Sequence, residues 1–127
     1  MSVSDESVEL LEVTPVIPAR DVAAAIMFYT EKLGFTESWC HGDPVDGAGI
    51  ARGSVNVHLF QCSEPNIAEW TAFRVRCTGI TAWYERCRAH AIVHPNGPLR
   101  TTPWGTSEFT VLDLDRVGIT FWEPAAS

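Results

Sequence analysis

The sequence predicts an α+β fold built from two βαβββ modules, and three observations support this prediction. A strand-like stretch, a helix-like stretch and three further strand-like stretches occur in the same order twice. Each copy closes on a polar turn between two strands, at residues 52–54 in the first and residues 113–117 in the second. The 127 residues suffice for one domain. We therefore expect a single domain over residues 1–127, with module one at about residues 10–62 and module two at about residues 70–124.

Module one begins with an apolar stretch, residues 10–17, which predicts a strand that Pro18 stops. Asp21 stands where a helix N-cap belongs and Gly34 where a helix stops, so residues 22–33 are expected to be helical. The inward face of this helix is expected to carry Val22, Ile26, Tyr29 and Leu33. Three strands should follow, at residues 35–41, 49–52 and 55–62.

Module two repeats the pattern less regularly. Residues 70–77 predict a strand, and residues 80–90 a helix whose inward face carries Ile80, Trp83, Tyr84 and Cys87. Residues 91–94 start a short strand, and residues 95–103, with three prolines and one glycine, predict an irregular loop. The module is completed by strands at residues 108–112 and 117–123, and residues 62–68 link it to module one.

Composition and charge exclude several classes of function. The chain is 46% apolar and 20% charged, as in ordinary globular proteins, and its net charge of −7 argues against nucleic-acid binding. No run approaches the ~18 apolar residues of a membrane span, and the polar, acidic residues 1–9 do not resemble a secretion signal. We therefore expect a cytoplasmic protein. Its four cysteines, Cys40, Cys62, Cys77 and Cys87, form no CxxC pair, which favours buried free thiols over a disulfide framework.

Short motifs recur in a characteristic order over about residues 11–124. They are Pro15-Val16-Ile17-Pro18-Ala19-Arg20-Asp21, Phe28-Tyr29, Lys32-Leu33-Gly34-Phe35, Arg52-Gly53-Ser54-Val55, Val57-His58-Leu59-Phe60, Pro103-Trp104-Gly105, Glu108-Phe109 and Asp113-Leu114-Asp115. Together they resemble the vicinal oxygen chelate superfamily of glyoxalase I, bleomycin resistance proteins, fosfomycin-modifying enzymes and extradiol dioxygenases, in particular the bleomycin-resistance branch. The resemblance implies a U-shaped mixed sheet around a concave cleft. It also implies a homodimer with pockets at the interface, with residues 1–13 available as an exchanged arm.

The resemblance also raises the question of a metal, because enzymes of the superfamily hold a divalent cation at four strand positions facing the cleft. Counting from Asp21 places these positions at Thr14, Asn56, Ala72 and Thr120. None is a strong ligand, and Ala72 has no donor atom. Alternation along the strand adds His58 to the face of Asn56, but one imidazole holds a catalytic metal poorly. We therefore expect no metal, no cofactor and no catalytic residue.

Strand alternation predicts which side chains line the cleft. Residues in phase with the vacant metal positions are Thr14, Val16, Asn56, His58, Phe60, Trp70, Arg74, Arg76, Thr120 and Trp122. Those out of phase should form the core: Val55, Val57, Leu59, Phe73, Val75, Ile119 and Phe121. The rim or floor is expected to include Trp39, Trp104 and Phe109. The predicted ligand-binding residues are Trp39, Asn56, His58, Phe60, Trp70, Arg74, Trp104, Glu108, Phe109 and Trp122.

The leading hypothesis is metal-free sequestration of a glycopeptide-type antibiotic in an aromatic cleft. Arg74 would repel a cationic antibiotic unless Glu108 or an aspartate pairs with it, so binding of a different, anionic ligand stays open. A metal-dependent enzyme of the glyoxalase or dioxygenase type would need a second subunit to complement His58. A homologue whose pocket is closed by Trp70 and Trp122 is the third alternative.

Overall fold

The computed structural model describes residues 5–126, and its fold consists of two similar halves. Module one contains β1 (Val16–Ala19), α1 (Val22–Leu33), β2 (Thr36–His41), β3 (Gly47–Arg52) and β4 (Val55–Gln61). Its four strands form a sheet in the order β1-β4-β3-β2, in which β1 is parallel to β4 and the other neighbours are antiparallel.

Module two repeats this topology. It contains β5 (Ala72–Arg76), α3 (Ile80–Ala89), β6 (Arg100–Thr101), β7 (Thr106–Leu112) and β8 (Gly118–Pro124), in the sheet order β5-β8-β7-β6. The first and last strands of the module are again parallel neighbours. Outside the modules lie a short 3₁₀ turn, η1 (Asp5–Ser7), and α2 (Pro65–Glu69) in the link. The α+β class and the duplicated βαβββ unit are confirmed.

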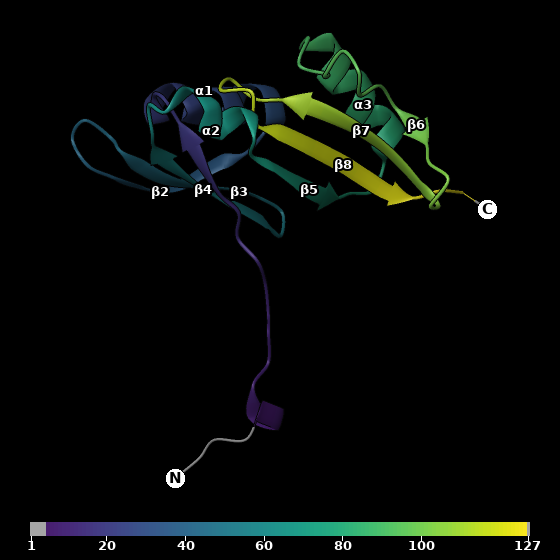
Figure 1. Cartoon of the computed structure of the whole chain (residues 1–127), viewed down its shortest axis with the longest axis horizontal. Coiled ribbons are helices and arrows are strands. Elements are labelled where there is room, and N and C mark those ends of the chain that lie inside the picture. The colour runs from purple at the N-terminus through teal and green to yellow at the C-terminus, as the bar shows by residue number, and fades with distance from the viewer. Residues whose placement is uncertain (1–4, 127) are drawn as a thin grey trace.

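The helices lie on one side of the two sheets, and the segment before β1 leaves the fold on the other side (Figure 1). The ends of α1 are formed as predicted. The Asp21 side chain accepts a hydrogen bond from the backbone N–H of Ala24, and Gly34 has a φ of 69°, the left-handed conformation that suits glycine. Val22, Tyr29 and Leu33 are buried in the helix–sheet core, whereas Ile26 is only partly buried.

The first strand begins later than predicted. Residues 10–17 were expected to be a strand ending before Pro18, but β1 covers Val16–Ala19 and includes this proline. Because β1 is the edge strand of its sheet, Pro18 needs no N–H on the side without a neighbour. The segment before β1 is extended and contacts little, since Leu10 and Val13 are 95% and 91% exposed.

Three other predictions around module two were wrong. Residues 91–94 form only an isolated bridge, Val93 with Val111, and the edge strand β6 lies instead inside the predicted loop. The link contains α2, which begins at Pro65, a residue suited to the first helical position because it needs no N–H donor there. The predicted strand over residues 70–77 starts at Ala72, so Trp70 is the C-cap of α2 and not a strand residue.

The core confirms the predicted phase of the strands. Val57, Leu59, Ile119 and Phe121 are buried, and Val55, Phe73 and Val75 are partly buried against them. Full burial of an apolar side chain of this size contributes about 1.5–3 kcal/mol, so a one-residue slip of register, which would expose the four buried ones, would be strongly disfavoured. The alternate side chains of β4, β5 and β8 therefore point to the face of the sheets away from the helices.

Hydrogen bonds from the acidic turn hold the two modules together. The buried Asp113 carboxylate accepts a 2.7 Å hydrogen bond from the Tyr29 hydroxyl, and it accepts two more from the backbone N–H groups of Asp115 and Val117. Asp115 in turn accepts from the backbone and the guanidinium of Arg20. Burial raises the pKa of Asp113, and burial together with the neighbouring Asp113 raises that of Tyr29 well above its ordinary range.

The cysteines and the helix lengths bear on two further expectations. All four cysteines are free, as predicted, but only Cys87 is buried, and Cys40 on β2 is exposed. Cys40 departs from the prediction because β2 is an edge strand that is exposed along its whole length.

Within residues 5–126, no helix has the length and apolar character needed to span a bilayer.

Candidate ligand-binding face

The strand face opposite the helices carries most of the predicted site residues. We call it the open face and define it by the in-phase side chains of three strands: Asn56, His58 and Phe60 of β4, Arg74 and Arg76 of β5, and Thr120 and Trp122 of β8. None of these side chains belongs to the buried core. The open face thus has the mixed aromatic and polar character that was predicted.

Module one contributes a cross-strand row to the open face. Trp39 lies opposite Gly49, Gly49 opposite His58, and His58 opposite Val16. Residues directly opposite one another share a face of the sheet, so all four positions point the same way. The Trp39 and His58 rings meet edge to face with centroids 5.0 Å apart. This contact crosses β3 only because Gly49 has no side chain: a Cβ atom there would overlap the Trp39 indole.

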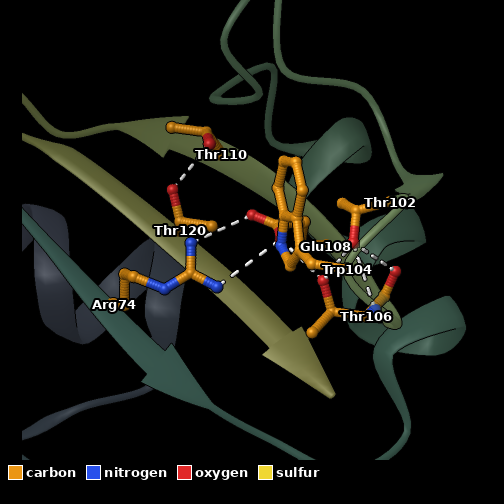
Figure 2. A network of polar contacts seen from close by, with 7 residues as sticks. All are labelled: Arg74, Thr102, Trp104, Thr106, Glu108, Thr110 and Thr120. Atoms are coloured by element: carbon orange, nitrogen blue, oxygen red, sulfur yellow. Dashed lines mark hydrogen bonds and ion pairs between the residues drawn. The ribbon is translucent and has the colours of Figure 1, made fainter. Parts of the chain in front are cut away.

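Module two contributes a polar network centred on Glu108 (Figure 2). The Glu108 carboxylate is almost fully covered, yet three neighbours donate to it. Arg74 donates from Nη1 to Oε2 at 3.0 Å, Trp104 donates from Nε1 to Oε1 at 3.0 Å, and the Thr106 hydroxyl donates to Oε1 at 2.7 Å. Thr102 extends the network through its hydroxyl, 2.8 Å from that of Thr106. The network fixes Trp104, although the side chain lies in a turn.

Charge on this part of the open face is only partly balanced. Hydrogen bonding from Arg74 lowers the pKa of Glu108, so the carboxylate is ionised at neutral pH and neutralises Arg74. The guanidiniums of Arg74 and Arg76 also lie against the Trp122 ring, 5.8 and 5.3 Å from its centroid. In the described part of the chain, Arg76 has no carboxylate partner within 4.0 Å. The open face therefore carries one unbalanced positive charge beside Trp122.

The donor set at the predicted metal positions does not suit a divalent cation. Thr14 precedes β1, and Asn56, Ala72 and Thr120 lie on three different strands. The Thr120 hydroxyl already shares a 2.8 Å hydrogen bond with Thr110. Hydroxyl, amide and methyl groups are poor ligands for the metals of this fold, and residues 5–126 hold no group of three or more His, Cys, Asp or Glu placed to bind one.

Two predicted ligand-binding residues lie elsewhere. Phe109 is only 2% exposed and packs in the core against Tyr84 and Phe121, so it faces the helices instead of a ligand. It neighbours Glu108 on β7 and therefore points to the opposite face, which strand alternation from Glu108 would have shown. Trp70 is 88% exposed at the end of α2, so the alternation that placed it in the cleft does not apply to it.

Gly49, Thr102 and Thr106 are part of this arrangement but were not predicted. Thr106 lies two residues from Glu108 on β7, so strand alternation places both side chains on one face. Thr106 could therefore have been predicted from Glu108. No pattern in the sequence indicates Gly49, because its contact with Trp39 depends on the pairing of β2 with β3.

A cavity of about 180 Å³ lies where the two modules meet. It is bordered by Val13 and Pro15 before β1, by Asn56, and by Phe73, Arg74 and Arg76 of β5. Pockets for drug-sized ligands usually measure about 300–1,000 Å³. The cavity accordingly accommodates only part of such a ligand.

Comparison with known proteins agrees with this geometry. The profile of the Glyoxalase/Bleomycin resistance protein/Dioxygenase superfamily matches residues 11–121. A bleomycin resistance protein of Geobacillus stearothermophilus is 28% identical over 136 aligned positions, which cover 93% of this chain and 100% of that protein. A bleomycin resistance protein of Staphylococcus aureus matches to the same extent.

Solved structures resemble the whole fold. The bleomycin-binding protein of bleomycin-producing Streptomyces verticillus, complexed with copper(II)-bleomycin, superposes with a TM-score of 0.73 at 27% identity, covering 94% of this chain and 99% of that one. A bleomycin resistance determinant encoded on a transposon has a TM-score of 0.77 at 20% identity and covers 92% and 100% of the two chains. The resemblance inferred from the motifs is confirmed, and the chain belongs to the glyoxalase/bleomycin resistance protein/dioxygenase superfamily.

Proposed function

We propose that this protein binds a bleomycin-type glycopeptide on its open face and withholds it from its target without chemical conversion. The observation that carries the proposal is the exposure of large aromatic side chains on or beside this face. Trp39 is 43%, Phe60 39% and Trp104 62% exposed. Exposed aromatics held in fixed positions favour the stacking of planar ligand groups.

The relatives support the choice of ligand. Proteins named for bleomycin resistance or bleomycin binding match at 27–28% identity over nearly the whole chain. One of them was solved with copper(II)-bleomycin bound. These relatives are thus named for resistance to this antibiotic or for binding it, which favours the same ligand class here.

Binding is favoured over catalysis by the chemistry of the cleft positions. Metal-dependent enzymes of this fold need several imidazole or carboxylate ligands, whereas this chain offers two hydroxyls, an amide and a methyl group at the four positions. The described His, Cys, Asp and Glu side chains provide no alternative cluster. The proposed binder therefore works without a metal of its own, in the cytoplasm, where its free cysteines stay reduced.

We further propose that the complete site lies in a homodimer cleft. The cavity of about 180 Å³ at the junction of the modules is small for such a ligand, so a second copy is needed to close the site. The segment before β1 exposes Leu10, Leu11 and Val13 almost fully. Apolar side chains this exposed in an extended segment suit exchange with a partner.

Arg76 favours an alternative ligand. It lies on the open face against Trp122 without a carboxylate partner among the described residues. Bleomycin-type ligands are cationic, whereas a planar anion could stack on Trp122 and pair with this guanidinium. An anionic ligand is therefore the second candidate.

The proposal is tested by isothermal titration calorimetry with metal-free and copper-loaded bleomycin. We expect one ligand per subunit and a Kd of 1 μM or below, about −8 kcal/mol or stronger. Trp104→Ala should weaken binding at least tenfold. Met27→Ala, which removes an exposed apolar side chain from α1, should leave it unchanged. An absence of heat with both forms of the antibiotic would reject bleomycin as the ligand and turn the search to anions.

A further inference from the structure

A second and larger cavity, of about 700 Å³, lies between the modules. Its walls come from the turn between β3 and β4, the end of β5 and the first turns of α3. Val75 and Phe121, whose side chains point toward the helices, line this cavity, and Arg76 borders it from the opposite phase of β5. The cavity therefore lies mainly on the helix side of the sheets, at the edge that β5 forms. It shares Val55, Val75 and Arg76 with the smaller cavity, but Arg52, Trp83 and Arg86 belong to neither the predicted site nor the proposed function.

Two guanidiniums converge at this cavity. Arg52 comes from the end of β3 and Arg86 from α3, and both lie against the Trp83 ring, 4.7 and 5.5 Å from its centroid. Both also approach Gly34, where an added Cβ atom would meet Arg52 Nη1 and would lie 3.4 Å from Arg86 Nη2. Arg76 borders the same cavity. Three positive side chains thus share one cavity in a chain of net charge −7.

These charges are not balanced by carboxylates. Among the described residues, the arginines paired with an acidic side chain are Arg20, Arg74, Arg88 and Arg116. Arg52 uses one of its donors on the Leu33 carbonyl, at 2.8 Å. An arginine has five N–H donors in a planar fork, so most of those on Arg52 and Arg86 are available. Like charges this close repel each other, and an anion between them would remove the repulsion.

The rest of the cavity is apolar. Phe35 and Phe121 are buried core residues, and Val55 and Val75 pack against the same core. Its volume lies within the usual range of small-molecule sites, about 300–1,000 Å³. An inorganic anion would leave these apolar walls unused, and a neutral apolar molecule would leave the guanidiniums unused. A ligand with an anionic head and an apolar body satisfies both.

We propose that this cavity is a second binding site, which takes a small amphipathic carboxylate. The carboxylate lies between the guanidiniums of Arg52 and Arg86, which meets the planar fork geometry of arginine. The apolar body lies along Phe35, Val55, Val75 and Phe121. Arg52 and Arg86, which hold the carboxylate, take no part in the proposed antibiotic function, although Arg76 borders both sites.

The test is calorimetric titration of the full chain with decanoate, below its micelle concentration, beside acetate and decanol. We expect one decanoate per chain, with acetate and decanol each binding at least tenfold more weakly. Arg86→Gln should weaken decanoate binding at least tenfold. Arg88→Gln is the matched control, because Arg88 lies on the same helix but pairs with Glu85, and it should bind like the wild type. The proposal would be overturned if decanol bound as tightly as decanoate, or if Arg86→Gln and Arg88→Gln weakened decanoate binding equally.

A second variant separates loss of the site from loss of the fold. Ala82→Phe fills the cavity without removing a charge, and Ala82 is an exposed residue of α3 at the cavity wall, so the helix should tolerate it. It should also abolish decanoate binding while the thermal unfolding midpoint stays within a few degrees of the wild type. Trp104→Ala should leave decanoate binding unchanged. Decanoate binding that Ala82→Phe preserves, or that Trp104→Ala removes, would place the ligand on the open face and reject the second site.

Discussion

Gly49 and Trp39 lie directly opposite each other on β3 and β2, and the indole of Trp39 occupies the space that a side chain at position 49 would fill. The ring thereby crosses β3 and meets His58 on β4 edge to face. A tryptophan on an exposed edge strand would otherwise sample several rotamers, at an entropic cost on binding. The pair holds the Trp39 ring on the open face before any ligand arrives.

Substitution of Gly49 by alanine should displace Trp39. The added methyl group overlaps the indole, so the ring must rotate away from His58. We expect at least tenfold weaker bleomycin binding and a shift in tryptophan emission, with about 1 kcal/mol loss of stability because Trp39 is partly exposed. Gly47→Ala is the matched control, since a Cβ atom there would have its nearest neighbour at 3.7 Å. If both variants bind equally well, the pair has no role in the ligand site.

Glu108→Gln tests the network that holds Trp104. The pKa of Glu108 is lowered from its ordinary value of 4.5, so its stabilising effect is complete above about pH 4.5 and is lost as the pH falls through the lower folded-state pKa. At pH 7 the variant should be about 1 kcal/mol less stable, a modest loss because Arg74 is half exposed. Urea unfolding between pH 7 and pH 3.5 should show that the free energy of unfolding falls more steeply with acidification in the wild type than in the variant. Identical pH profiles would contradict an ionised, paired Glu108.

Tyr29→Phe tests the connection between the modules. The variant removes the hydroxyl that donates to Asp113 and leaves one oxygen of a buried carboxylate without this partner. We expect a loss of about 1–3 kcal/mol, measured by urea unfolding at neutral pH. Tyr84→Phe is the control, because among the residues that the structure describes the Tyr84 hydroxyl has no such buried carboxylate partner, and its ring contact with Phe109 is retained. Equal losses of stability in the two variants would show that the hydrogen bond from Tyr29 to Asp113 does not stabilise the fold.

Replacing both Leu10 and Leu11 by serine tests the proposed homodimer. Both side chains are more than four-fifths exposed in the single chain, so the change should not affect the folded monomer. We expect sedimentation velocity to show a dimer for the wild type and a dissociation constant raised at least tenfold for the variant. Leu114→Ser, an exposed change in the turn after β7, is the control. A wild-type monomer at every concentration would reject the exchanged arm.

The local elements were predictable because their signals lie close together in the sequence. Asp21 and Gly34 mark the two ends of α1, and alternation in β4 and β8 separates the core residues from the open face. His58 and Trp122 were assigned correctly by that alternation. Predictions failed where alternation was applied outside a strand, as at Trp70, and where it was not applied at all, as at Phe109, which was expected at the rim or floor of the cleft.

The sequence alone thus determined the two βαβββ modules, the ends of α1 and which side chains of β4, β5 and β8 face away from the helices, because these depend on periodicity and on neighbours within a few residues. Only the tertiary structure decided that Arg74 is neutralised by Glu108, that Gly49 makes room for Trp39, and that Arg52 and Arg86 converge on one cavity. Each of these joins side chains from different elements, and its geometry depends on how those elements pack, which no local pattern in the sequence encodes.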